Sequence, residues 1–206
     1  MIKQYMKKNK IIVLILLMVL LIMGLIIYKI KTKNLKNGNN ISSQEIVDYI
    51  LSINSYKSII NVQVNSNKNS NKYIIEQEYN TENGSVQKVI EPENIAGVKI
   101  SLKDKSLKIE NTNLSLSQMF ENYQGLEDNS LDLISFIEDY KTNEKSIFEE
   151  NENEVILKTK NHSKNRYNQN KVLYINKENK LPTKLIVEDD NNNTTINIKY
   201  NNIEIY

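Results

Sequence analysis

The stretch YKSIINVQVNSNKNSNKYIIEQEY, residues 56–79, decides the fold predicted for this chain. Ile60, Val62 and Val64 alternate with polar residues, and this two-residue period is that of a strand with one buried face. Residues 67–71 between the two halves are asparagine, serine and lysine, and the first two favour turns. The stretch therefore predicts a β-hairpin with one apolar face.

An amphipathic helix is predicted immediately before the hairpin, over residues 42–54. Ser42 and Glu45 have the spacing of a capping box, in which each side chain satisfies a free backbone N–H of the first helical turn. Apolar residues follow on one helical face, namely Ile46, Val47, Ile50, Leu51 and Ile53. This pattern indicates a helix that packs one side against the sheet.

Alternating apolar residues predict further strands after the hairpin. Asn83 and Gly84 are typical of a type I′ turn, which needs positive φ angles at both residues. Another turn is expected at residues 104–105. The apolar positions change phase near the C-terminus, which predicts a β-bulge at residues 201–202. Strands are expected over residues 85–91, 98–102, 107–109, 154–160, 171–176, 181–188 and 194–206.

Two short helices are predicted in the middle of the chain, because apolar residues recur there at the i, i+3, i+4, i+7 spacing of a helical face. The first contains Leu116, Met119, Phe120 and Tyr123, and the second contains Leu133, Phe136, Ile137 and Tyr140. This order of helices and strands predicts an α+β fold. We expect one strongly curved antiparallel sheet, a half-barrel, whose concave face is covered by the helices as a lid.

A separate segment is predicted at the N-terminus, where residues 11–28, IIVLILLMVLLIMGLIIY, are long and apolar enough for one transmembrane helix. The run ends in tyrosine and lysine instead of the small residues of a signal-peptide cleavage site, so we expect an uncleaved anchor. Residues 1–10 are then a short tail. Residues 29–41 are polar and basic, which indicates a flexible stalk of roughly 20 Å. Residues 42–206 are expected to form the folded domain.

Composition excludes several classes of function. The 27 basic and 25 acidic residues give a net charge of only +2, so no nucleic-acid partner is expected. The chain contains no cysteine, which excludes disulfides, thiolate metal sites and lipidation on cysteine. No nucleotide-binding, serine-hydrolase or metalloprotease motif occurs. We therefore expect no cofactor and no catalytic activity.

Three polar segments are interpreted as surface features. His162, the only histidine, lacks neighbouring metal ligands in the sequence and is expected in an exposed loop. Residues 189–193 begin like a calcium-binding loop but lack its glycine, so a hairpin turn is favoured. The cluster of Glu149, Glu150, Glu152 and Glu154 is expected to be a solvated loop.

Four segments carry a resemblance to a known family: ILSINSYK at 50–57, SNKNSNKY at 66–73, VIEPENIAG at 89–97 and LPTKL at 181–185. With them, most of residues 42–206 resembles the LolA/LolB-like lipoprotein-carrier fold and, within it, the clostridial germination lipoprotein GerS and its relatives. The resemblance implies a curved sheet around an apolar cavity, which in the carriers accepts acyl chains. It also implies, for GerS-like members, an accessory role that supports a cell-wall amidase during cortex modification in spores.

The chain departs from this family in two ways. GerS is held by a lipid on a cysteine, whereas a transmembrane anchor is predicted here. The carriers place an arginine from an early strand in the cavity, but the only arginine of this chain is Arg166, in a polar stretch. The predicted anchor is compatible with a GerS paralogue that has another partner. The missing arginine weakens the lipid-carrier interpretation, and the tether weakens it further, because a stalk of roughly 20 Å cannot carry cargo between two membranes.

Two main functions are compatible with these patterns. In the first, a non-enzymatic protein in the cell membrane, with a single span and an extracytoplasmic domain, binds a cell-wall amidase in sporulation and germination. In the second, the half-barrel binds a lipid or acyl ligand. The inward aliphatic residues would be core in one case and cavity lining in the other, and alternation does not separate the two. They are Ile60, Val62, Val64, Val98, Ile100, Leu102, Leu107, Ile109, Ile196 and Ile198.

Two other modes of action are considered. An exposed strand edge would allow a partner, or a second copy, to pair by strand addition or exchange. A role as an envelope-stress sensor is disfavoured, because residues 1–10 are too few for an internal effector domain and leave only a short docking peptide.

Overall fold

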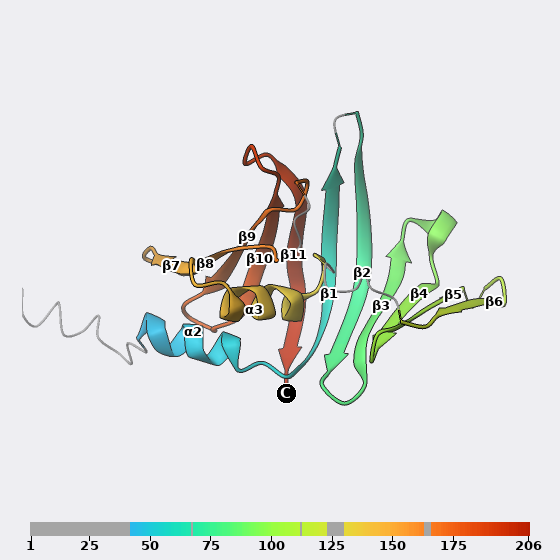
Figure 1. The fold of residues 1–206 in the computed structure, drawn as a ribbon, viewed down its shortest axis with the longest axis horizontal. Coiled ribbons are helices and arrows are strands. Elements are labelled where there is room, and N and C mark those ends of the chain that lie inside the picture. The colour runs from blue at the N-terminus through green and yellow to red at the C-terminus, as the bar shows by residue number, and fades with distance from the viewer. Residues whose placement is uncertain (1–41, 67, 112, 123–129, 163–165) are drawn as a thin grey trace, which may run out of the picture. The chain divides into compact units, whose positions relative to one another are not determined.

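An antiparallel sheet of eleven strands contains most of the residues that the structure describes (Figure 1). The computed structural model describes residues 42–66, 68–111, 113–122, 130–162 and 166–206. The strands lie in the order β6-β5-β4-β3-β2-β1-β11-β10-β9-β8-β7. Their bounds are β1 Ser55–Asn65, β2 Ser70–Asn80, β3 Gly84–Glu91, β4 Val98–Lys103, β5 Ser106–Asn111, β6 Leu116–Phe120, β7 Ile147–Glu150, β8 Glu154–Lys160, β9 Asn170–Asn176, β10 Pro182–Glu188 and β11 Thr194–Ile205.

Two meanders form this sheet, because the strands of β1–β6 and of β7–β11 each pair with their neighbours in sequence. The first and last strands, β1 and β11, join the two meanders at the centre of the sheet. Ile59 lies opposite Asn202 and Ile60 opposite Tyr200, so Asn201 is an extra residue in β11. The predicted β-bulge is therefore confirmed, and it returns Ile203 to the face occupied by Ile198.

Two α-helices pack against one face of the sheet, which we call the inner face. Helix α2 (Ser43–Leu51) precedes β1, and α3 (Leu133–Thr142) lies between β6 and β7. The predicted capping box is present, with the Ser42 hydroxyl accepting from the N–H of Glu45 at 3.2 Å and the Glu45 carboxylate accepting from the N–H of Ser42 at 3.2 Å. The helices and the inner face share one core cluster, which includes Ile46, Ile50, Leu133, Phe136, Ile60, Leu157, Leu173, Leu185 and Ile198.

The helices divide the sheet into two regions. Figure 1 shows α2 and α3 over strands β8–β11, whereas β3–β6 extend away from them. We call β1, β2 and β7–β11 the covered half, and β3–β6 the wing. The 3-10 helix η1 (Glu93–Ile95) connects β3 to β4 within the wing. The predicted α+β class is confirmed, because the described residues form an open, curled antiparallel sheet with two α-helices.

One predicted helix is wrong, because Leu116, Met119 and Phe120 lie in strand β6. Their helical spacing covers only five residues, and the same residues fit a strand equally well. Each of the five pairs with a residue of β5, from Leu116 opposite Asn111 to Phe120 opposite Leu107. Positive φ angles at Ser115 and Asn122, 52° and 53°, also end regular helix geometry on both sides. Tyr123, the last residue of the predicted set, lies outside the described residues. The second predicted helix is confirmed as α3.

The turn before β3 differs in type from the prediction. Gly84 has the expected positive φ of 78°, but Asn83 does not have a positive φ. The N–H of Asn83 donates to the carbonyl of Asn80, which leaves a three-residue loop followed by a left-handed glycine. A Cβ at Gly84 would overlap the carbonyl oxygen of Leu102 on β4, so glycine is needed here for space as well as for its φ angle. The turn predicted at residues 104–105 is confirmed, with positive φ at both.

The predicted transmembrane anchor, residues 11–28, lies outside the described residues, as do the tail and the stalk. Among the residues that are described, no helix has the length and apolar character needed to cross a membrane.

Candidate functional site

The ten predicted inward residues all lie on the inner face, because strand pairing places them in register. On β1 and β11, Ile60, Val62 and Val64 lie opposite Tyr200, Ile198 and Ile196. On the wing, Ile100 lies opposite Ile109, and Leu102 opposite Leu107. Val98 has the same parity as Ile100 and Leu102 along β4. The two groups of residues differ in what covers them.

The inner face of the covered half is packed core. Ile60 and Ile198 have no exposed surface, and Val62 is 2% exposed. Phe136 and Leu133 of α3 are also fully buried and belong to the same cluster. The predicted helical residue Ile137 is buried in it, and Tyr140 packs against it, with its ring 6.0 Å from that of Phe136. The helices therefore fill the space where an apolar ligand of this half would lie.

The inner face of the wing is apolar but largely uncovered. Leu107 is buried, but Ile109 is 37% exposed, Phe120 41% and Leu116 63%. Strand pairing places these side chains on one surface with the half-buried residues of β4. We call this surface the wing surface, and it consists of Val98, Ile100, Leu102, Ile109, Leu116 and Phe120. Large exposed apolar patches of this kind mark interaction sites in soluble domains.

A cleft of about 430 Å³ separates α3 from the wing. Burial raises the pKa of Glu138, on the α3 side, above its ordinary value, and the nearby Asp132 raises it further. The cleft lining includes Tyr79, Ser85, Leu102, Lys103, Lys105, Asp132, Ile134, Ser135 and Glu138. Helix α3 therefore does not close over the wing surface.

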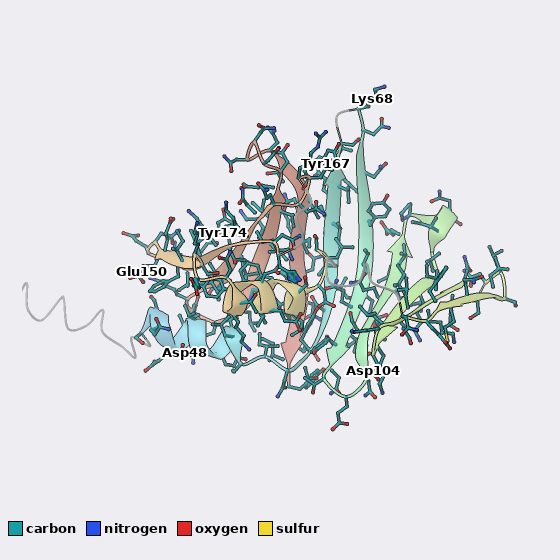
Figure 2. The ribbon with its side chains drawn as sticks, in the orientation of Figure 1. Asp48, Lys68, Asp104, Glu150, Tyr167 and Tyr174 are labelled. Atoms are coloured by element: carbon teal, nitrogen blue, oxygen red, sulfur yellow. The ribbon has the colours of Figure 1, made fainter. Side chains whose placement is uncertain are left out.

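The two edges of the sheet differ in charge. Strand β6 ends the wing with the sequence LSQMF, and all five residues are exposed and uncharged. Strand β7 ends the covered half with IFEE, where Ile147 and Phe148 are also exposed. Glu149 forms an ion pair with Lys158 at 2.7 Å, and Glu150 one with Lys177 at 2.6 Å. Charged side chains on an edge strand oppose pairing with other chains, so β6 is the less protected edge. Figure 2 shows Glu150 on the left side of the sheet and Asp104, in the turn between β4 and β5, at the lower side of the wing.

The acidic cluster expected in a loop is thus partly a strand, because Glu149 and Glu150 belong to β7 and Glu154 begins β8. The segment from 189 to 193 is confirmed as a hairpin turn between β10 and β11. Its Asp189 carboxylate accepts from the backbone N–H groups of Asn191 and Asn193, at 2.9 and 2.8 Å. Across the described ranges, no group of three or more His, Cys, Asp or Glu residues is placed to hold a metal ion.

Buried polar groups fix the start of α3 to the sheet. The Asp132 carboxylate caps the helix by accepting from the N–H of Ile134, and it accepts from the hydroxyls of Tyr56 and Ser85, each at 2.6 Å. Burial, reinforced by the Asp132 charge, raises the pKa of Tyr56 well above its ordinary value. Gln77 of β2 donates to the carbonyl of Leu131 at 2.8 Å. These contacts hold one end of α3 over β1, β2 and β3.

A second buried polar group fixes the other end of α3 and was not predicted from the sequence. Lys171 of β9 is fully buried and donates to the Asp139 carboxylate at 2.5 Å and to the Ser135 hydroxyl at 3.0 Å. His162, whose side chain is 50% exposed, lies at the rim with Nδ1 3.4 Å from the same carboxylate. One indication was present in the sequence. Lys171 precedes the inward residues Leu173 and Ile175 by two and four positions, and this spacing places all three side chains on the same face of the strand.

A family model, described as sporulation protein YdcC-like, matches residues 7–205 of this chain. The chain therefore belongs to the YdcC-like family of sporulation proteins. No significant match is found among curated proteins.

Two solved structures with TM-scores above 0.5 share the fold, and a third match is more distant. One match is to a chain in the structure of the complex between the CwlD amidase and the GerS lipoprotein from Clostridioides difficile, with 23% identity, a TM-score of 0.52, and 82% of this chain and 98% of that chain covered. Another is an uncharacterized conserved protein from Thermus thermophilus, with 10% identity, a TM-score of 0.51, and 81% and 88% covered. The LolA superfamily protein NE2245 from Nitrosomonas europaea has 13% identity, a TM-score of 0.43, and 81% and 94% covered. The sporulation family and the fold shared with the GerS complex confirm the resemblance found in the sequence.

Proposed function

We propose that this sporulation protein is a membrane-anchored, non-enzymatic partner that binds and supports a cell-wall amidase. The observation that carries the proposal is the wing surface together with the uncharged edge strand β6, an apolar interaction surface that α2 and α3 leave uncovered. The choice of an amidase as partner is supported by the fold shared with the structure of CwlD in complex with GerS. Residues 11–28 would hold the protein in the cell membrane, with the domain on the extracytoplasmic side.

The proposed contact combines two physical contributions. The exposed backbone edge of β6 can extend the sheet by one strand from the partner, which gives main-chain hydrogen bonds. The wing surface can bury apolar side chains of the same partner, which supplies most of the favourable free energy. Lys108 and Glu110 on the neighbouring strand β5 form an ion pair with each other at 2.6 Å, so little uncompensated charge lies beside the edge.

The test is capture of the tagged full-length protein from cross-linked membranes of sporulating cells of its own organism, followed by mass spectrometry. We expect a cell-wall amidase in stoichiometric amount. Capture of a lipid or lipoprotein without an amidase would contradict the proposal. It would favour the alternative, in which an acyl ligand binds the half-barrel and, because the covered half is filled, contacts the wing surface.

A matched pair of variants locates the contact. Phe120→Lys places a charge at the β6 edge, and Phe148→Lys places the same charge at the β7 edge, where the native side chain has a similar exposure, 43% against 41%. We expect Phe120→Lys to lower amidase capture at least tenfold and Phe148→Lys to leave it unchanged. Equal losses in both variants would exclude a specific role for the wing.

A further inference from the structure

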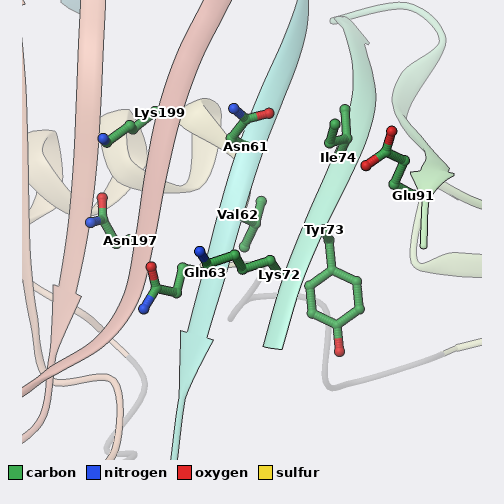
Figure 3. Close-up of a pocket in the computed structure, with 9 residues that line it drawn as sticks. All are labelled: Asn61, Val62, Gln63, Lys72, Tyr73, Ile74, Glu91, Asn197 and Lys199. Atoms are coloured by element: carbon green, nitrogen blue, oxygen red, sulfur yellow. The ribbon is translucent and has the colours of Figure 1, made fainter. Parts of the chain in front are cut away.

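A groove of about 320 Å³ lies on the outer face of the sheet, opposite α2 and α3, and crosses β11, β1 and β2 (Figure 3). Its floor is polar, because the residues that point outward alternate with the buried Ile60 and Val62 of β1. The lining residues are Asn61, Val62, Gln63, Lys72, Tyr73, Ile74, Glu91, Asn197 and Lys199. No part of the wing surface contributes to this groove.

Strand register arranges the groove residues in two rows across three strands. In one row, Lys199 of β11 lies opposite Asn61 of β1, which lies opposite Ile74 of β2. In the other row, Asn197, Gln63 and Lys72 are aligned in the same way. Strand spacing makes this grid about 10 Å across the strands and about 7 Å along them. The two lysines therefore lie at diagonally opposite corners, with three side-chain amides between them.

The two lysines carry uncompensated charge. Within the described part of the chain, neither Lys72 nor Lys199 has a carboxylate within ion-pair distance. In contrast, Lys57, further along the same face of β1, is paired with Glu76 at 2.9 Å. Glu91 is the one carboxylate in the groove lining, so the groove has a net positive charge. An anionic group on a ligand would find two available cationic donors here.

The groove lining also contains a hydrogen-bond acceptor, the Glu91 carboxylate, which calls for a donor on the ligand. The Asn197 side-chain oxygen has no donor among the described residues, but it is screened from solvent, so a ligand in the groove does not reach it without a shift of the side chain. Gln63 is oriented by its own contacts, because its amide nitrogen donates to Asn65 and to Ser70, each at 3.0 Å. A bare oxyanion would bring only acceptors toward the Glu91 carboxylate in the groove lining, which is unfavourable. The ligand should therefore carry hydroxyl or N–H donors beside its negative charge.

We propose that this groove binds an acidic saccharide, that is, a hydroxylated or acetamido sugar that carries a carboxylate. Lys72 and Lys199 bind the carboxylate, and the Asn61 amide and the Glu91 carboxylate bind hydroxyl or acetamido groups. The site is independent of the amidase contact, since the two use opposite faces of the sheet. It would give the domain a direct attachment to a carboxylate-bearing glycan of the cell wall.

The test is co-sedimentation of the purified full-length protein, in detergent, with insoluble cell-wall peptidoglycan. The variant Lys72→Gln/Lys199→Gln removes both groove charges. Its control, Lys88→Gln/Lys99→Gln, removes the same charge from a facing pair on the outer face of the wing. We expect the groove variant to lower the apparent affinity at least tenfold and the control to change it less than twofold. An undiminished affinity in the groove variant, or equal losses in both, would overturn the proposal.

Soluble probes then identify the source of the carboxylate. Peptide-free glycan strands, isolated stem peptides, an uncharged chitin oligosaccharide and anionic phosphatidylglycerol vesicles are titrated against the same protein. Saturable binding of the glycan strands, lost in the groove variant, supports the site. Binding only to the peptides, or equal binding to the vesicles or to the uncharged sugar, contradicts it. Amidase capture should be unchanged in the groove variant, so failure of this proposal and failure of the amidase proposal are distinguishable.

Discussion

The covered half and the wing have the same alternation of apolar residues in one continuous sheet, but their inner faces differ in solvent exposure. Ile60 and Ile198 are fully buried under the helices, whereas Ile109, at an equivalent inward position of the wing, is 37% exposed. The difference lies in the second layer, because Asp132 and Asp139 fix α3 over the covered half, and their contacts reach only the first strand of the wing, β3. An inward pattern therefore defines a face, and the position of the helices decides whether that face is core or interaction surface.

The largest effect is expected from removing matched aromatic rings in the two regions. Phe136→Ala in the covered half removes a fully buried ring and should lower the free energy of unfolding by about 3–5 kcal/mol. Phe120→Ala in the wing removes a ring that is 41% exposed and should cost less than about 1 kcal/mol. Urea unfolding of the full-length variants measures both. Equal losses would show that the wing is packed in solution, and the comparison of the two regions would then be wrong.

The next largest effect concerns the ion pairs. Asp139→Asn leaves the fully buried Lys171 without its countercharge, and removing one partner of a buried pair typically costs about 3–5 kcal/mol. Glu110→Gln breaks the exposed pair with Lys108 in the wing and should hardly move the urea midpoint. A small change for Asp139→Asn would mean that water reaches Lys171, and that the covered half is looser than its packing indicates.

The extent of successful prediction differs between the two regions for a physical reason. In the covered half, local signals were sufficient: the Ser42 capping box, the helical face of Phe136 and the phase change at Asn201 each specify one geometry. In the wing, the short run LSQMF fits a helix or a strand, and its pairing with the preceding strand β5 decides between the two.

The candidate site was predictable only in part. Alternation placed all ten aliphatic residues on one face, but it gave no information on which of them the helices cover. The contact between Asp139 and Lys171 joins residues 32 positions apart. The sequence indicated it only through the parity of Lys171, which places this side chain on the inner face. The outer groove depends on the register of β1 with β2 and β11, which the sequence of a single strand does not specify.

A smaller difference in stability is expected between variants of the two helix caps. Asp132→Ala removes a buried cap that also accepts from Tyr56 and Ser85, so we expect a loss of about 2–3 kcal/mol. Ser42→Ala removes an exposed cap and should cost about 1 kcal/mol. Thermal unfolding followed by circular dichroism measures both. If Ser42→Ala were the more harmful, the anchoring of α3 by Asp132 would not be what positions the helix layer.

The smallest change in stability is expected for one of two buried tyrosines in the covered half. The Tyr56 hydroxyl donates to Asp132, whereas the Tyr200 hydroxyl has no partner among the described residues. Tyr200→Phe should therefore change stability at pH 7 by less than about 1 kcal/mol in either direction, because it removes a buried hydroxyl that gains no hydrogen bond. Tyr56→Phe should be clearly destabilising, since it leaves the Asp132 carboxylate with one donor fewer.

The same pair of variants gives a pH dependence with a defined sign. Burial raises the pKa of Tyr200 above its ordinary value of 10.0, and the charge of Asp132 adds to this. In alkali the unfolded chain loses this proton before the folded chain does, so the unfolded state binds fewer protons and stability falls as the pH rises above 10. Tyr200→Phe removes this contribution, so its loss of stability between pH 10 and 11 should be shallower than that of the native chain. If stability fell equally steeply with pH in the two proteins, Tyr200 would ionise as freely as an exposed tyrosine. Its buried position under the helix layer would then be wrong.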